Sequence, residues 1–213
     1  MTFFQGGTPM TDRRTFLASL AATPAVAAVA GDLALAARDA RLTTEPWDLR
    51  WLDELNGTYR QVFDCSELSN EPLRVVSNYF RAFKEVLGLE HPTVNAIVAI
   101  ASRSFPINAS DALWARYGIA EKWKIPAGAD RQPPTRNIFA AEAADLKAKG
   151  AFFWQCNNAL NRITERFATE SGRPLAEVRA EVVAGLLPGV KIVPAHTMFL
   201  GLVQHRGCAY EKL

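Results

Sequence analysis

The stretch Thr93–Ala101, TVNAIVAIA, is almost continuously apolar and rich in β-branched residues. A strand with one solvent-facing side alternates apolar and polar residues, whereas an uninterrupted apolar run is typical of a strand buried on both faces of a parallel sheet. Parallel neighbours need a crossover connection, which is usually an α-helix. The stretch therefore predicts an α/β fold with three layers, in which helices cover both faces of a mostly parallel sheet.

The segments on either side alternate between strand and helix patterns. Apolar residues in Glu71–Leu87 recur at the spacing of one helical face, and Tyr59–Cys65 before it reads as a short strand. Residues 124–137 hold three prolines and predict a loop. We expect a five-stranded sheet with strands at 59–65, 93–101, 151–155, 190–193 and 208–212, and helices at 71–87, 108–117, 140–149, 157–167, 175–186 and 197–205.

The N-terminus has the features of an export signal. Arg13 and Arg14 are followed one residue later by Phe-Leu and then by an alanine-rich apolar run, an order that resembles a twin-arginine signal. The run is too short for an ordinary spanning helix of ~20 residues. We predict a signal peptide at 1–30, a flexible leader at 31–46, and one domain at 47–213 in the periplasm, reached in the folded state.

Composition excludes two classes of partner. Without residues 1–30 the chain has 22 basic and 21 acidic residues, so nothing in its charge predicts a nucleic-acid partner. No apolar stretch after the signal is long enough to span a membrane. Three cysteines are an odd number, so at least one thiol remains outside any intramolecular disulfide.

Polar and thiol side chains follow several predicted strands at the point where each strand ends. Cys65 closes the first strand, Arg103 follows the second, Cys156 the third and His196 the fourth. Ligands and chemistry gather beyond the carboxyl ends of strands in open parallel sheets. Cys208 instead begins its strand, so we expect it at the opposite edge of the sheet.

Cys156 is the candidate catalytic residue. It stands where a strand gives way to a helix, and the free N–H groups and positive dipole end of a helix N-terminus favour a thiolate over a thiol. A buried structural cysteine fits the same pattern, because free cysteine is among the most buried residue types. Four residues near the ends of the strands are the candidate substrate-binding residues: Asp64, Arg103, Asn157 and Asn158. Arg103 could hold an anion such as thiosulfate, or pair with a carboxylate, Asp64 or Asp111.

Several motifs, in order, resemble the DsrE/DsrF-like proteins of bacterial sulfur metabolism. They are Gly150–Leu160 (GAFFWQCNNAL), Leu187–Pro194 (LPGVKIVP) and Gln204–Tyr210 (QHRGCAY), while Asp111–Tyr117 (DALWARY) and Arg136–Phe139 (RNIF) resemble a larger, exported branch. The resemblance covers the chain from about Tyr59 onward. It implies a five-stranded α/β sandwich that forms trimers or hexamers.

The same resemblance implies an activity. A cysteine at the position of Cys156 carries a persulfide in the sulfur-relay members, so the chain is expected to be a sulfur carrier or sulfurtransferase, or to perform thiol redox chemistry. Its partners would be a small sulfur compound and a sulfur-acceptor protein, and the chemistry needs no metal.

Two other arrangements of the cysteines remain open. Cys65, Cys156 and His196 could converge on zinc or copper if their strands are near neighbours, although no C-x-x-C or H-x-x-x-H spacing supports a metal. Such a binding protein, or a non-catalytic oligomeric subunit, is the alternative function. Cys65 and Cys156 could also form a disulfide.

Overall fold

The structure is a computed structural model that describes residues 47–68, 71–127 and 131–213. The signal peptide predicted at residues 1–30 and the leader predicted at 31–46 lie outside the described residues. In the described part of the chain, no helix is both long and apolar enough to cross a bilayer.

Five parallel strands form one sheet in the order β4-β3-β2-β1-β5. The apolar run at 93–101 contains β2, the central strand of the sheet, and all seven residues of this strand are buried. Its position explains the composition, because a central parallel strand has side chains packed on both faces. The strands are β1 Tyr59–Cys65, β2 Val94–Ile100, β3 Ala151–Cys156, β4 Lys191–Val193 and β5 Ala209–Lys212.

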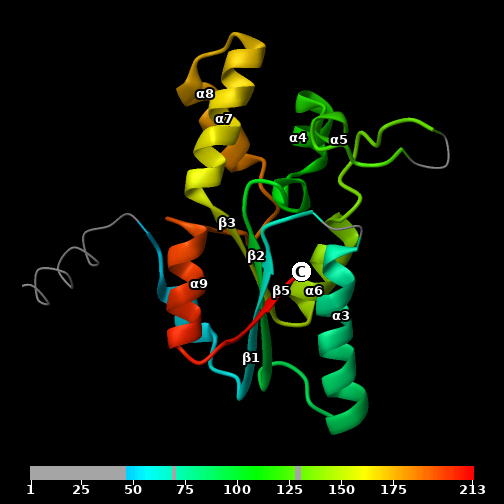
Figure 1. The fold of residues 1–213 in the computed structure, drawn as a ribbon, viewed down its shortest axis with the longest axis vertical. Coiled ribbons are helices and arrows are strands. Elements are labelled where there is room, and N and C mark those ends of the chain that lie inside the picture. Colours follow the sequence, from blue (N-terminus) through cyan, green and yellow to red (C-terminus); the bar gives the residue numbers. More distant parts are fainter. Residues whose placement is uncertain (1–46, 69–70, 128–130) are drawn as a thin grey trace, which may run out of the picture. The chain divides into compact units, whose positions relative to one another are not determined.

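Helices lie on both faces of the sheet, which confirms the predicted three-layer α/β fold (Figure 1). The layer that contains α3 and α6 covers one face, and α9 with η1 covers the other. The helices are η1 Arg50–Glu54, α3 Pro72–Ala82, the π-helical η2 Phe83–Leu87, η3 Phe105–Asn108, α4 Asp111–Tyr117, α5 Ile119–Lys122, α6 Ala140–Ala148, α7 Asn157–Ser171, α8 Leu175–Ala184 and α9 His196–His205.

Alternation along the strands divides the core into two apolar clusters, one on each face. Phe63 and Cys65 pack in the cluster under α3, α6 and α7, whereas Val62 packs in the cluster under α9 and η1. The same two faces continue from strand to strand, as the pairing shows: Cys65 is in register with Ile100, and Ile100 is in register with Gln155. Residues in register on neighbouring parallel strands share a face. Cys65 and Gln155 therefore lie on one face, and Cys156 on the other.

The helices α7 and α8 extend beyond the carboxyl ends of the strands (Figure 1). The apolar side of α7 packs into the first cluster through Leu160, Ile163 and Phe167. The ring of Phe167 stacks on that of Tyr117 with centroids 4.0 Å apart, which joins α7 to α4. These contacts fix the end of the sheet at which the candidate site residues lie.

The sequence-based boundaries differ from the structure in a few places. The helix predicted at 157–167 continues to Ser171, and the helix predicted at 197 begins at His196. Three short helices, η1, η3 and α5, were not predicted. The prediction for the last strand is confirmed: β5 runs parallel to β1, so Cys208, just before β5, lies at the amino ends of the strands.

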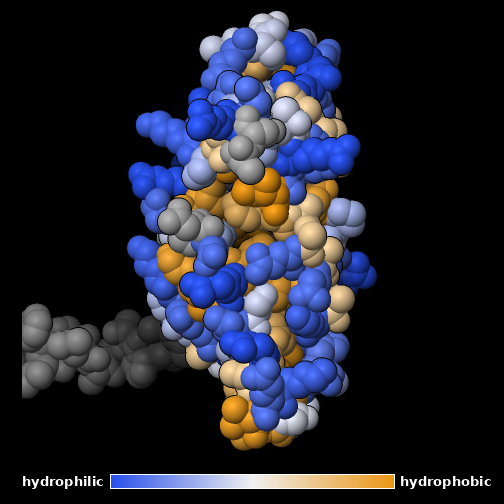
Figure 2. All heavy atoms as spheres, turned by 90° about the vertical axis from the view of Figure 1, so that its right-hand side faces the viewer, coloured by the Kyte–Doolittle hydropathy of each residue, from blue (hydrophilic) through white to orange (hydrophobic). Residues whose placement is uncertain are grey.

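The outer surface of the α3 and α6 layer is mainly hydrophilic (Figure 2). Apolar groups appear in the middle of this face and at its lower end. In η2, which continues α3, Val86 is 78% exposed and Leu87 is 54% exposed. Neighbouring exposed apolar residues of this kind are common at contacts between proteins.

Candidate functional site

The sheet has one point at which neighbouring connections leave in opposite directions. The chain leaves β3 into α7 on the side of the first cluster, and it leaves β4 into α9 on the opposite side. In open α/β sheets the crevice between two such strands, beyond their carboxyl ends, is the usual ligand site. Cys156 is the last residue of β3 and His196 the first of α9, so both residues stand at this switch point.

The sulfur of Cys156 lies at the start of two helices. Cys156 is the N-cap residue of α7, and its Sγ accepts a hydrogen bond from the backbone N–H of His196, the first residue of α9, at 3.3 Å. Free N–H groups and the positive dipole ends of helices favour an anion at such a place. The sulfur therefore meets a backbone donor at the start of α9, and its residue directly precedes α7.

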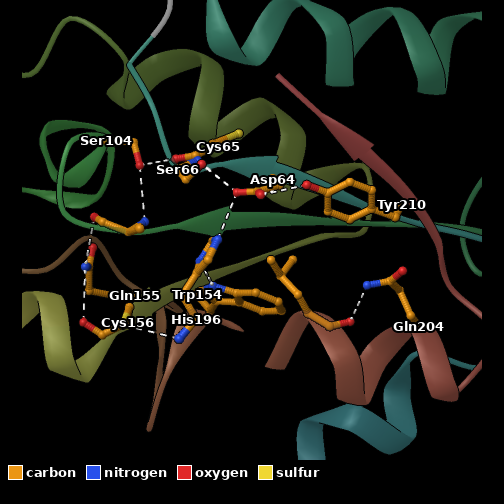
Figure 3. Close-up of polar contacts among 12 residues, drawn as sticks. Asp64, Cys65, Ser66, Ser104, Trp154, Gln155, Cys156, His196, Gln204 and Tyr210 are labelled. Atoms are coloured by element: carbon orange, nitrogen blue, oxygen red, sulfur yellow. Dashed lines mark hydrogen bonds and ion pairs between the residues drawn. The ribbon is translucent and has the colours of Figure 1, made fainter. Parts of the chain in front are cut away.

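The imidazole of His196 is held on both of its nitrogens (Figure 3). The indole Nε1–H of Trp154 donates to Nδ1 at 3.3 Å, and Nε2 lies 2.8 Å from Oδ1 of Asp64. An indole N–H can only donate, so Nδ1 is the acceptor and Nε2 carries the proton that goes to the carboxylate. His196 therefore has no free ring nitrogen for a metal or for proton transfer.

Asp64 completes this network as a buried carboxylate. Its Oδ2 accepts a hydrogen bond from the hydroxyl of Tyr210 at 2.8 Å, and its Oδ1 also accepts the backbone N–H of Ser66 at 3.0 Å. Burial acts to raise the pKa of this carboxyl, but the hydrogen bonds from Tyr210, His196 and Ser66 outweigh it and leave the pKa below its usual value. Both oxygens of Asp64 are thus bonded to other residues of the protein, and one of these bonds holds His196 at the start of α9.

The thiol of Cys156 is almost inaccessible to reagents in solution. The side chain of Cys156 is 5% exposed and lines neither of the two cavities described for the chain. It is one of the buried core residues, and the hydrogen bond that its sulfur accepts comes from the backbone N–H of His196. A reagent can reach the sulfur only if the starts of α7 and α9 separate locally.

The metal site considered for Cys65, Cys156 and His196 is not formed. Cys65 is on the opposite face of the sheet from Cys156, and β2 lies between their strands. In the ranges that the structure describes, no group of three or more His, Cys, Asp or Glu side chains could hold a metal ion. All three cysteines are free, so the disulfide between Cys65 and Cys156 is absent as well.

The other predicted substrate-binding residues lie in two different places. Asn157 and Asn158 directly follow the thiol at the start of α7; Asn157 accepts a hydrogen bond from the guanidinium of Arg179, and Asn158 is exposed. Arg103 is away from the Asp64 and His196 network: its Nη1 pairs with Glu67 at 2.7 Å. Its partner is thus neither of the two carboxylates named from the sequence.

Sequence reasoning missed Tyr210, Trp154 and Arg179 as parts of the site. Tyr210 pairs in register with Val62, which places it on the same face as Asp64. Arg179, on α8, has a buried Nη1 without a partner in the described residues, and burial lowers its pKa. Alternation within β3 puts Trp154 on the face of Cys156, and this was the one signal in the sequence for any of the three.

Comparisons with known proteins assign no activity to this chain. No protein-family model matches the chain, and no curated protein matches it. Among solved structures, the chain is similar to MTH1491 of Methanobacterium thermoautotrophicum, a protein of unknown function. The two are 19% identical with a TM-score of 0.42, and the match covers 73% of this chain and 99% of the archaeal one. A likeness of this kind carries no function from one protein to another.

Proposed function

We propose that this protein carries sulfur, or performs thiol redox chemistry, through Cys156. The observation that supports the proposal is the position of Cys156 at the switch point of the sheet, where the residue directly precedes α7 and its Sγ accepts the first N–H of α9. A backbone N–H donor such as that of α9 is one form of support that a nucleophilic sulfur can use, and it requires neither a metal nor an adjacent base.

The chemistry is a pair of balanced displacements. The Cys156 thiolate attacks the sulfane sulfur of thiosulfate; a new sulfur–sulfur bond forms, the old one breaks, and sulfite leaves with its electron pair. Cys156 then holds a persulfide anion. The thiolate of an acceptor attacks the outer sulfur and takes it, and the Cys156 thiolate is the leaving group. No net oxidant or reductant is consumed.

In this proposal the surrounding residues position the sulfur and its backbone donor, and they do not transfer protons. Asp64 fixes His196, and the backbone N–H of His196 then points at the sulfur. Asn158, exposed beside the thiol, can meet an incoming oxyanion, and Asn157 connects the site to Arg179. His196 is not proposed as a base, because both of its ring nitrogens are engaged.

The resemblance to the DsrE/DsrF-like family leads to the same proposal. The export signal predicted within residues 1–30 would place the reaction in the periplasm, where the sulfur donor and acceptor would differ from those of a cytoplasmic relay. A homo-oligomer, trimeric or hexameric, is part of the proposal.

One observation favours a second candidate, a non-catalytic oligomeric subunit. Cys156 is almost fully buried and faces no described cavity. A thiol that never becomes accessible would serve only to accept the first N–H of α9, and the protein would then act through its surfaces.

Mass spectrometry of the intact folded protein separates the two candidates. The protein is incubated with thiosulfate or with polysulfide, and the mass is compared with that of Cys156→Ser, Cys65→Ala and Cys208→Ala. We expect a sulfur atom to be added to the native chain and to the Cys65 and Cys208 variants, and no addition to Cys156→Ser.

The conditions must be shown to load a known sulfur carrier in parallel. An unmodified mass under those conditions, or an addition that survives in Cys156→Ser, would reject sulfur carriage through Cys156. A persulfide seen only after denaturation would favour the non-catalytic subunit.

A further inference from the structure

A cavity of about 650 Å³ opens beyond the carboxyl ends of β1 and β2, at the same end of the sheet as α5 and α7 (Figure 1). Its volume lies within the range of ordinary small-ligand sites. Cys156 does not line it, so the cavity is separate from the thiol. Five of the ten lining residues are basic: Arg103, Lys122, Lys124, Arg162 and Arg166.

These basic residues come from three parts of the chain. Arg103 follows β2, Lys122 ends α5, and Arg162 and Arg166 lie one turn apart on α7. Like charges at this i,i+4 spacing repel each other and destabilise an isolated helix. An anion bound in the cavity would attract both arginines and offset the repulsion between them.

Carboxylates neutralise only part of this charge. Arg103 pairs with Glu67 at 2.7 Å, while Glu170 takes both Arg166 at 2.8 Å and Lys122 at 3.0 Å. Two acidic groups therefore face five basic ones, which leaves three positive charges in excess. In the described ranges, neither Arg162 nor Lys124 has a carboxylate partner, although both line the cavity.

Trp123 lines the cavity and is held in place by its neighbours. The ring of Trp123 lies against Phe105 with centroids 5.6 Å apart, and its Nε1–H donates to the carbonyl of Ser102 at 3.2 Å. The guanidinium of Arg166 lies over the same ring at 5.9 Å. Trp123 thus positions Arg166 and is not free to stack on a ligand base. The groups left to contact a ligand are therefore the basic side chains that line the cavity.

We propose that this cavity binds a small multivalent oxyanion, such as a diphosphate. Three excess positive charges match a ligand of charge about −3 better than a monovalent ion. A sphere of 650 Å³ is roughly 11 Å across, somewhat more than the Debye length of ~8 Å at physiological salt, so the attraction between an anion and the five cations should weaken as the ionic strength rises. The proposal is independent of any reaction at Cys156.

Calorimetric titration of the full chain with inorganic pyrophosphate, at low ionic strength and without divalent metals, tests this site. We expect saturable binding, with orthophosphate bound at least about ten-fold more weakly. Arg162→Gln should weaken pyrophosphate binding by about ten-fold, the worth of one hydrogen bond to a charged group. Arg162 is exposed and without a carboxylate partner in the described residues, so its replacement leaves the fold intact, as circular dichroism would verify.

Arg74→Gln is the matched control. Arg74 is an exposed arginine on α3 outside the cavity, and this variant lowers the net charge by the same amount. It should leave the affinity unchanged. Absence of pyrophosphate binding to the native chain, or equal weakening by the two variants, would overturn the proposal, since equal weakening means attraction to the surface as a whole.

Discussion

Nε2 of His196 donates a hydrogen bond to Oδ1 of Asp64 at 2.8 Å, across a separation of 132 residues. The bond fixes the first residue of α9, whose backbone N–H meets the sulfur of Cys156. A buried carboxylate on β1 and a thiol at the end of β3 are thus connected through one residue.

The charge of Asp64 should make stability depend on pH in the acid range. Because the folded pKa is lower than that of the unfolded chain, the ionised carboxylate stabilises the fold at neutral pH. That stabilisation disappears as the pH falls from about 4 through the folded pKa. Asp64→Asn keeps the shape without the charge, and should cost about 2 kcal/mol at pH 7 and flatten the acid limb of a urea-unfolding series. An acid limb as steep as that of the native chain would contradict the assignment.

Tyr210→Phe should have a smaller effect of the same sign. The variant removes one hydrogen bond to Asp64, from a side chain that is 44% exposed, so we expect a loss of about 1 kcal/mol in unfolding free energy. The hydrogen bond to Asp64 also raises the pKa of the Tyr210 phenol. Burial also raises the pKa of Tyr79, to about 12, and that of Tyr117, so ultraviolet titration of the native chain should show three tyrosines ionising late. One of these three late ionisations should be missing in Tyr210→Phe.

The tautomer of His196 can be measured directly. Nitrogen-15 NMR at pH 7.5 should show the proton on Nε2, because the Trp154 indole N–H occupies Nδ1. Trp154→Phe removes that donor and should bring signals of the other tautomer, while the tautomers of His91 and His205 stay as they are. A native His196 with the proton on Nδ1 would contradict the described network.

Cys65 should be inert to alkylation in the folded protein. Its side chain is fully buried, and burial, followed by the negative charge of Asp64, raises the pKa of its thiol. Iodoacetamide at pH 8 should leave Cys65 unmodified until the chain unfolds, as peptide mapping would show. Modification of Cys65 at the rate of an exposed thiol would mean that the α3 side of the sheet opens readily.

Lys147 should be an unusually reactive amine. Burial lowers the pKa of Lys147 to about 8, so near pH 8 about half of the population is neutral and nucleophilic. Lys149, close by and ion-paired with Asp145, is the internal comparison. Limited acetylation at pH 8 should label Lys147 at least about ten-fold faster than Lys149. Equal labelling would show that the Lys147 ammonium keeps its proton.

Local patterns predicted the elements well but could not show how they meet. The apolar run of β2 and the helical spacing of α3 are properties of neighbouring residues, and both predictions are confirmed. The helix α5 was missed because Gly118, with a φ of 57°, ends α4 and lets a new four-residue helix begin at once. Such a break leaves little periodicity to detect.

The order of the strands in the sheet determines which side chains meet at the candidate site, and no local sequence pattern reveals that order. Cys65 and Cys156 both end strands, so the sequence allowed them to converge; the intervening β2 and their opposite faces keep them apart. Tyr210 reaches Asp64 only because the last crossover carries β5 to the far side of β1, a contact across 146 residues.

That last crossover has a consequence for biosynthesis. The four strands β1 to β4 can assemble while α9 and β5 are still to be made, but Asp64 then has neither of its side-chain partners. A solitary carboxylate beneath an uncovered apolar face is a state that a chaperone or protease can recognise. The pairing of Asp64 is therefore completed only when α9 and β5 have docked.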